Sequence, residues 1–121
     1  MKNNIVLNKS LDFAVRIVKL YKYLTTNKKE FILSKQLLRS GTSVGANLRE
    51  AKYAQSKDDF IHKNSLALKE ISETEYWLEL LYKTDYLTCN EYENIIIDCS
   101  EIAKLLTKIV KTNKGINNVN C

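Results

Sequence analysis

The amino-acid sequence predicts an all-α protein, folded as a single antiparallel, up-down-up-down four-helix bundle over residues 1 to 121. The chain holds no proline and only three glycines, so few positions can interrupt a helix. Apolar residues recur at spacings of three and four in four long segments, as they do on the buried face of a helix. The segments between them are short, and short connections place consecutive helices antiparallel.

The first helix is expected to run from Ser10 to Leu24. Ser10 is a good N-cap residue, and the apolar pattern weakens after Leu24. The second helix is expected to begin near Asn27, which has capping-box spacing to Glu30, and to end at about Gln55.

Three further signals mark breaks in the helical pattern. Gly45 is the weak point of the second helix and predicts a kink or a restart there. Ser56 with Asp59, and Thr88 with Glu91, have the spacing of capping boxes at the start of the third and fourth helices. The third helix is expected over residues 56 to 83, the fourth over residues 88 to 113, and a disordered tail over residues 114 to 121.

One face of the second helix carries polar residues beside its apolar stripe. At 100° per residue these polar residues fall within roughly 60° of arc, at the margin of the expected core. Polar groups held at such a margin need hydrogen-bond partners. We therefore predict a hydrogen-bond network that fixes helix packing or the register of an assembly, formed by Gln36, Ser43, Asn47 and Glu50.

The segment from residue 36 to residue 60, QLLRSGTSVGANLREAKYAQSKDDF, resembles the signature of a bacterial family. Its members are four-helix-bundle proteins encoded in intervening sequences of large-subunit (23S) ribosomal RNA genes. The shared pattern is Gln, Arg, Ser, Asn and Glu in this order and spacing, followed by Phe. The resemblance covers roughly residues 10 to 112. Ala51, Lys69 and Asp85 depart from it, each at a position where glycine is usual or frequent in the family.

The resemblance implies a ring-forming homo-oligomer, commonly a pentamer, with no established activity. A related pentameric bundle, the accessory variability determinant of diversity-generating retroelements, is similar in fold and associates with a reverse transcriptase and nucleic acid. The implied partners are therefore further copies of the chain, RNA or DNA, and a nucleic-acid-processing protein.

Two helices carry more apolar surface than one bundle core can cover. On the first helix, Leu11 and Val15 lie on one side, and further apolar residues extend the arc well past half the circumference. A surplus of this kind most often marks a protein contact. On the third helix the predicted oligomer interface consists of Leu66, Trp77 and Leu80, with packing of Trp77 under a loop of its own chain as the alternative.

Charge is segregated along the chain, whose net charge is +5. Residues 1 to 57 hold 12 Lys or Arg and 3 Asp or Glu, residues 58 to 101 hold 3 and 11, and residues 102 to 121 hold 4 and none. Basic surfaces attract polyanions, although the same charges also serve to attract neighbouring helices or copies. The candidate nucleic-acid-binding residues are Lys35, Arg39, Arg49 and Tyr53 on the second helix, and Lys104, Lys108 and Lys111 on the fourth.

Nothing in the sequence indicates an enzyme, a cofactor or a metal centre. His62 is the only histidine, so a di-iron site of the kind that some bundles hold lacks its ligands. The carboxylates of the third helix are more simply a solvated or subunit-facing charge set than a cation site. Three irregularly spaced cysteines do not make a disulfide framework and fit a reducing compartment. With no signal peptide and no run of 18 apolar residues, the expected location is the cytoplasm, without membrane contact.

The predicted function is non-catalytic. An oligomeric bundle would bind nucleic acid, or accompany RNA, as an accessory protein. The alternative is a protein-interaction scaffold without nucleic-acid binding, in which the basic and acidic surfaces serve assembly alone.

Overall fold

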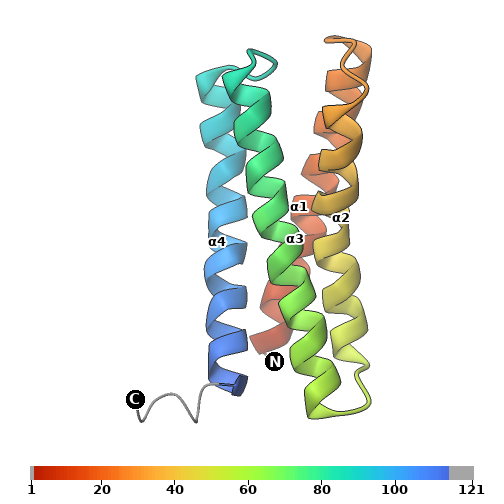
Figure 1. Cartoon of the computed structure of the whole chain (residues 1–121), viewed down its shortest axis with the longest axis vertical. Coiled ribbons are helices and arrows are strands. Elements are labelled where there is room, and N and C mark those ends of the chain that lie inside the picture. The colour runs from red at the N-terminus through yellow and green to blue at the C-terminus, as the bar shows by residue number, and fades with distance from the viewer. Residues whose placement is uncertain (1, 115–121) are drawn as a thin grey trace.

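The computed structural model describes residues 2 to 114, with side chains over residues 5 to 113. Figure 1 shows four helices, each running opposite to the one before it, so the all-α, up-down-up-down prediction is confirmed. Lys114 still belongs to the fourth helix, and the rest of the predicted tail lies outside the described residues. The helices are α1 (Lys2–Thr26), α2 (Leu33–Lys52), α3 (Lys57–Lys83) and α4 (Cys89–Lys114).

Each helix packs against two neighbours, so the four helices form a square. The α2–α3 contact is the most extensive and the α1–α4 contact is the smallest, while α2 and α4 lie across the diagonal of the square. In Figure 1 the α1–α2 hairpin and the α3–α4 hairpin separate toward the end that holds the connections within each hairpin.

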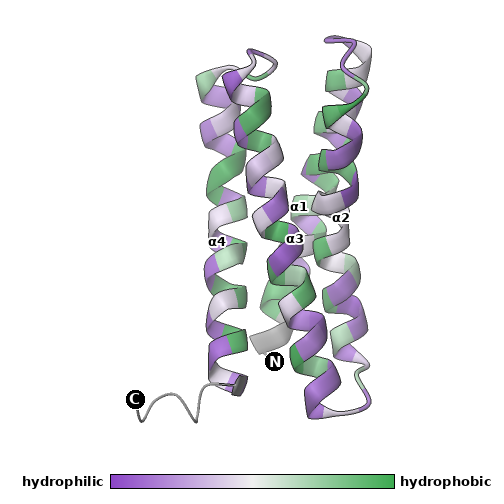
Figure 2. Cartoon of the chain, in the orientation of Figure 1, coloured by the Kyte–Doolittle hydropathy of each residue, from purple (hydrophilic) through white to green (hydrophobic). Residues whose placement is uncertain are grey.

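The core lies along the axis of this square and consists mainly of branched aliphatic side chains. Figure 2 shows hydrophobic and hydrophilic residues alternating along every helix, as one-sided burial requires. Phe13 and Ile17 of α1 and Leu78 of α3 are fully buried. Leu11 and Val15 instead remain 53% and 48% exposed, so the predicted apolar surplus on α1 is confirmed.

α1 begins at Lys2, so the predicted N-cap at Ser10 is wrong. Val6 is buried and continues the apolar pattern before Ser10, whose hydroxyl donates a hydrogen bond to the Leu7 carbonyl at 2.7 Å. Gly45 of α2 packs against this serine, because a Cβ at Gly45 would lie 3.2 Å from Ser10 Oγ. The glycine therefore permits a close approach of α1 and α2. The helix continues through it, so the predicted restart is wrong.

α2 begins at Leu33, later than predicted, because Glu30 caps it from outside the helix. The Glu30 carboxylate accepts hydrogen bonds from the backbone N–H groups of Ile32, Leu33 and Ser34 at 3.1, 2.9 and 2.7 Å. Burial raises the pKa of this carboxyl, but the three N–H groups outweigh burial and hold the pKa below its ordinary value. The capping box predicted at Asn27 is therefore wrong, since its glutamate serves a helix that begins three residues later.

The other two predicted caps are confirmed. The Asp59 N–H donates to Ser56 Oγ at 3.0 Å. At α4, the Glu91 N–H donates to Thr88 Oγ1 at 3.1 Å and the Thr88 N–H donates back to Glu91 Oε1 at 2.8 Å. In the turn between α3 and α4, Asp85 has a φ of 70°, the left-handed conformation that glycine adopts most readily and aspartate tolerates.

Candidate nucleic-acid interface

The outer side of α2 presents cations and an aromatic ring to solvent. Lys35 and Arg49 are both exposed, and Tyr53, immediately after the helix, is 68% exposed. The ammonium of Lys52 lies 5.6 Å from the centroid of the Tyr53 ring. Helical spacing puts Lys35, Arg49 and Tyr53 on one line of about 27 Å at 1.5 Å per residue. We refer to these three residues as the α2 row.

Arg39 shares this side of α2, but its charge is already paired. Its Nη2 atom lies 2.6 Å from Glu73 Oε2 and 3.3 Å from Glu70 Oε1. Glu73 also accepts a hydrogen bond from Trp77 Nε1 at 3.0 Å. The bonds from Arg39 and Trp77 hold the pKa of Glu73 below its ordinary value, and the bonds to Glu73 and Glu70 raise the pKa of Arg39. Arg39 therefore links α2 to α3 and is a poor candidate for a free phosphate contact.

A shallow groove of about 240 Å³ borders the α2 row where α2 meets α1. Its lining combines small and apolar residues with one cation, and none of the lining residues is acidic. A chain of phosphates that followed the row would therefore meet no repulsion from the groove. The lining residues are Leu7, Ser10, Leu11, Ala14, Thr42, Gly45, Ala46 and Arg49.

The second predicted basic set lies on α4, across the bundle from the α2 row. Lys104, Lys108 and Lys111 are all exposed and border a shallow hollow of about 410 Å³. Because α2 and α4 lie on the diagonal of the square, the fold does not bring the two basic sets onto one surface of a single chain.

The polar stripe of α2, which consists of Gln36, Ser43, Asn47 and Glu50, makes local contacts within this chain. Ser43 donates its hydroxyl to the Arg39 carbonyl at 2.6 Å, and Asn47 Nδ2 donates to the Ser43 carbonyl at 3.0 Å. Glu50 pairs with Lys63 of α3 at 2.7 Å. Gln36 is exposed. These contacts tie the stripe to α2 and α3, and the wider network stays a prediction.

The predicted interface residues of α3 are half-buried within the chain. Leu66 and Leu80 are partly covered. Trp77 packs against the core, although the sequence predicts it on the apolar surface that the core leaves uncovered, and its ring lies 5.0 Å from that of Tyr76. Their role in an interface stays a prediction. Larger exposures among the described apolar and aromatic side chains are found at Ile5, Leu11, Val15, Phe31, Ile32, Tyr53, Tyr76 and Ile97.

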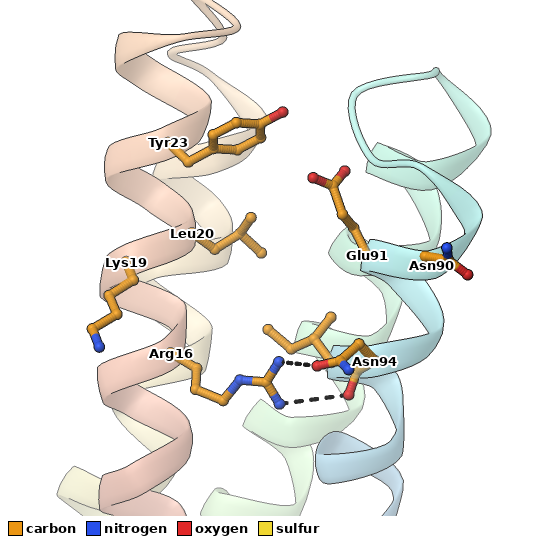
Figure 3. Close-up of a pocket in the computed structure, with 8 residues that line it drawn as sticks. Arg16, Lys19, Leu20, Tyr23, Asn90, Glu91 and Asn94 are labelled. Atoms are coloured by element: carbon orange, nitrogen blue, oxygen red, sulfur yellow. Dashed lines mark hydrogen bonds between the residues drawn. The ribbon is translucent and has the colours of Figure 1, made fainter.

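The separation of the two hairpins leaves an open cleft of about 580 Å³ between α1 and α4. Leu20 and Tyr23 of α1 stand on one wall and Glu91 of α4 on the other (Figure 3). Arg16 spans the cleft, donating hydrogen bonds to the side chain and the carbonyl of Asn94, as Figure 3 shows. A further bond joins Arg16 to Asp98. The charge of Arg16 is therefore already neutralised. The remaining lining residues are Lys19, Asn90 and Ile95.

A further basic surface, which the sequence does not predict, lies in the connection between α1 and α2. Lys28 and Lys29 are exposed, and they are followed by Phe31 and Ile32, which are 58% and 75% exposed. The sequence predicts these residues inside the second helix, whereas the structure places them before its first residue, Leu33. The available signal was an apolar pair separated from two lysines by a single glutamate. We call these four residues the basic tip.

No group of three or more His, Cys, Asp or Glu side chains among the described residues is placed to hold a metal ion. The Cys99 thiol is buried and points to the Ile71 carbonyl at 3.7 Å, and burial raises its pKa. Cys99 is therefore a core residue. Within residues 2 to 114, no helix is long and apolar enough to span a bilayer.

Comparison with known proteins places these features in a family. Residues 2 to 108 match the model of the 23S rRNA-intervening sequence protein family. The chain is also similar to the crystal structure of a protein of unknown function from the S23 ribosomal protein family of Bacteroides thetaiotaomicron. The two are 62% identical with a TM-score of 0.90, and the match covers 92% of this chain and 99% of that one. None of the curated proteins matches the chain.

Proposed function

Because the chain belongs to the 23S rRNA-intervening sequence protein family, we propose that it is a non-catalytic accessory protein that binds nucleic acid as a homo-oligomer. The observation that carries the proposal is the α2 row. The single acidic residue within α2, Glu50, is paired with Lys63, while Lys35 and Arg49 have no acidic partner among the described side chains.

The chemistry of the α2 row favours single-stranded RNA over a duplex read by its bases. Lys35 and Arg49 supply charge to phosphates, and the exposed ring of Tyr53 offers a stacking surface for one base. Over residues 2 to 114, no motif presents a base-reading helix or sheet to a groove. The expected binding is therefore strongly dependent on salt and weakly dependent on sequence.

A homo-oligomer would repeat the α2 row in every copy. One copy offers two phosphate contacts and one stacking ring, which is a weak site. A single RNA strand that reached several copies would bind them together, and the apparent affinity would rise through effective concentration. Oligomerisation thus supports the proposed function without requiring further contacts on each chain.

The test is a filter-binding titration of a single-stranded RNA at several salt concentrations. Replacing Lys35 and Arg49 with Gln should make the log-log salt slope shallower by about 0.7 for each cation removed, and Tyr53→Ala should cost about 1 to 3 kcal/mol. Lys83→Gln is the matched control, since Lys83 is an exposed cation that pairs with Glu79. If the row variants retained RNA as well as the control did, the α2 row would not be the site.

The second candidate function is a protein scaffold in which charge serves assembly alone. The observation that favours it is the engagement of Arg39 by Glu70 and Glu73, which shows basic and acidic helices already pairing within one chain. The absorbance ratio at 260 and 280 nm of freshly purified protein, before any high-salt wash, separates the two functions. Co-purifying nucleic acid supports RNA binding, and its absence together with no retention of RNA at low salt supports the scaffold.

A further inference from the structure

The basic tip exposes two large apolar side chains in the connection between α1 and α2. Phe31 and Ile32 are 58% and 75% exposed and directly adjacent. Figure 2 shows the hydrophobic end of this connection following a hydrophilic stretch. Neighbouring exposed apolar side chains of this size mark a surface that another molecule covers.

The backbone of the basic tip is held in place by the chain itself. The Glu30 carboxylate accepts the N–H groups of Ile32, Leu33 and Ser34, and the Glu30 N–H donates to the Leu24 carbonyl at 3.0 Å. Phe31 and Ile32 are thus presented on an ordered turn. The turn has two exposed lysines, Lys28 and Lys29, against this one buried carboxylate, so the surface around the apolar pair has a net positive charge.

The α3–α4 end of the bundle carries the opposite charge. Asp85, Glu91 and Glu93 are exposed, and none of them forms an ion pair with another described side chain. Lys28 and Lys29 at the basic tip likewise have no acidic partner there. One end of the molecule therefore offers two surfaces of opposite charge, one on each hairpin.

The α1–α4 cleft lies toward this same end, since its lining includes Tyr23, close to the end of α1, and Glu91, close to the start of α4. Figure 1 shows the two hairpins separating toward this end. Leu20, Tyr23 and Ile95 give the cleft an apolar part, while Asn90 and Glu91 supply polar and acidic groups on the α4 side. On the α1 side, Arg16 is occupied by Asp98 and Asn94, while Lys19 is exposed and has no ion pair among the described side chains. The side of the cleft that suits an incoming lysine is therefore the α4 side.

We propose that the basic tip of one copy of this chain inserts Phe31 and Ile32 into the α1–α4 cleft of a second copy. Lys28 and Lys29 then lie toward the acidic α4 end. A nucleic acid or an anionic bilayer fits the lysines but leaves the cleft and the unpaired carboxylates without a partner, whereas a second copy engages all of them. This contact would join the copies of the proposed homo-oligomer, so the inference rests on the homo-oligomerisation in the proposed function.

The two surfaces in this contact are different, so the contact is heterologous. Each copy uses its tip on one neighbour and its cleft on another. Repetition of such a contact gives a ring if the rotation closes and an open chain if it does not.

Light scattering with size-exclusion chromatography tests the apolar part of the contact. The wild type should be a multimer, and Phe31→Ser combined with Ile32→Ser should be a monomer with unchanged helical circular dichroism. Ile97→Ser is the matched control, because Ile97 is 65% exposed on the outer side of α4 and should leave the mass unchanged. A monomeric wild type, or a double variant of wild-type mass, would overturn the contact.

A mixing experiment tests the pairing of tip with cleft. Asn90→Lys combined with Glu91→Gln changes the charge of the cleft, and Gln at position 91 still suits the capping box. This cleft variant should be monomeric alone and should form a two-chain complex with the tip variant, since each contributes one intact surface. Two monomeric variants that fail to combine would overturn the pairing.

Binding assays with other partners complete the test. If the tip variant kept the wild-type mass but lost binding to phosphatidylserine vesicles or to single-stranded RNA, the basic tip would serve that partner and the contact between copies would be wrong. Failure of the proposed RNA binding is distinguishable, because it is read from the Lys35, Arg49 and Tyr53 variants, which leave the tip and the cleft intact.

Discussion

Arg39 of α2 and Glu73 of α3 form an ion pair with an Nη2–Oε2 distance of 2.6 Å, and the same carboxylate oxygen holds the indole N–H of Trp77 at 3.0 Å. This pair removes Arg39 from the set of free cations on α2. It also orients Trp77 at the α2–α3 contact, the most extensive in the bundle.

Arg39→Gln should therefore have little effect on RNA retention, whereas Arg49→Gln should weaken it. Both groups of the Arg39–Glu73 pair are partly exposed, at 48% and 31%, so its loss should cost no more than about 1 kcal/mol of unfolding free energy. The sole tryptophan reports the change, and its fluorescence should shift in Glu73→Gln. Equal losses of RNA binding in the two arginine variants would contradict the idea that the ion pair keeps Arg39 from binding RNA.

Glu30→Ala should destabilise the protein at neutral pH by about 1 to 3 kcal/mol, because three backbone N–H groups at the start of α2 lose their acceptor. The folded-state pKa of Glu30 lies below its ordinary value of 4.5, so its stabilisation is fully present above about pH 4.5 and is lost as pH falls through the folded pKa. Urea denaturation of wild type and Glu30→Gln from pH 7 to pH 3 measures this effect. The gap between their unfolding free energies should narrow in acid, and a gap independent of pH would contradict the assigned role.

The substitutions Gly41→Ala and Gly45→Ala should change the free energy of unfolding by different amounts. A Cβ at Gly41 would lie 2.9 Å from both Cγ atoms of Ile17, which is completely buried, so overpacking should cost about 1 to 3 kcal/mol. A Cβ at Gly45 meets the Ser10 hydroxyl at 3.2 Å, and a small shift relieves it. The helix-propensity gain of alanine, about 1 kcal/mol, should make that variant nearly neutral. Thermal denaturation compares them, and equal destabilisation would show that α1 and α2 separate as easily at both positions.

Helix boundaries set by interactions between residues close in sequence were predicted correctly, and boundaries set by contacts from elsewhere in the chain were not. Thr88 and Glu91 cap each other across three residues, so their spacing in the chain was enough to find them. Ser10 and Glu30 are residue types that cap helices, but burial against α2 placed Ser10 inside α1, and Glu30 turned toward the helix after it. Spacing alone does not distinguish these cases, because the deciding contacts come from outside the predicted element.

The residues of the candidate site also divide into those predicted by local spacing and those decided by contacts with other helices. Lys35, Arg49 and Tyr53 could be grouped by helical spacing, and the structure leaves them exposed on one line. Arg39 could not be separated from them, since its partners stand 31 and 34 residues away on another helix. The basic tip was missed because it required the correct start of α2.

The sequence by itself determined the four helices, their antiparallel order, two of their caps and the family to which the chain belongs, because periodicity and spacing are properties of neighbouring residues. Only the tertiary structure decided which charges are free and which apolar side chains remain uncovered. Arg39 is paired while Arg49 is not, and Phe31 is exposed while Phe13 is completely buried. Residue types do not distinguish the members of these pairs; the packing of one helix against another does, since pairing and burial depend on atoms far away in the chain.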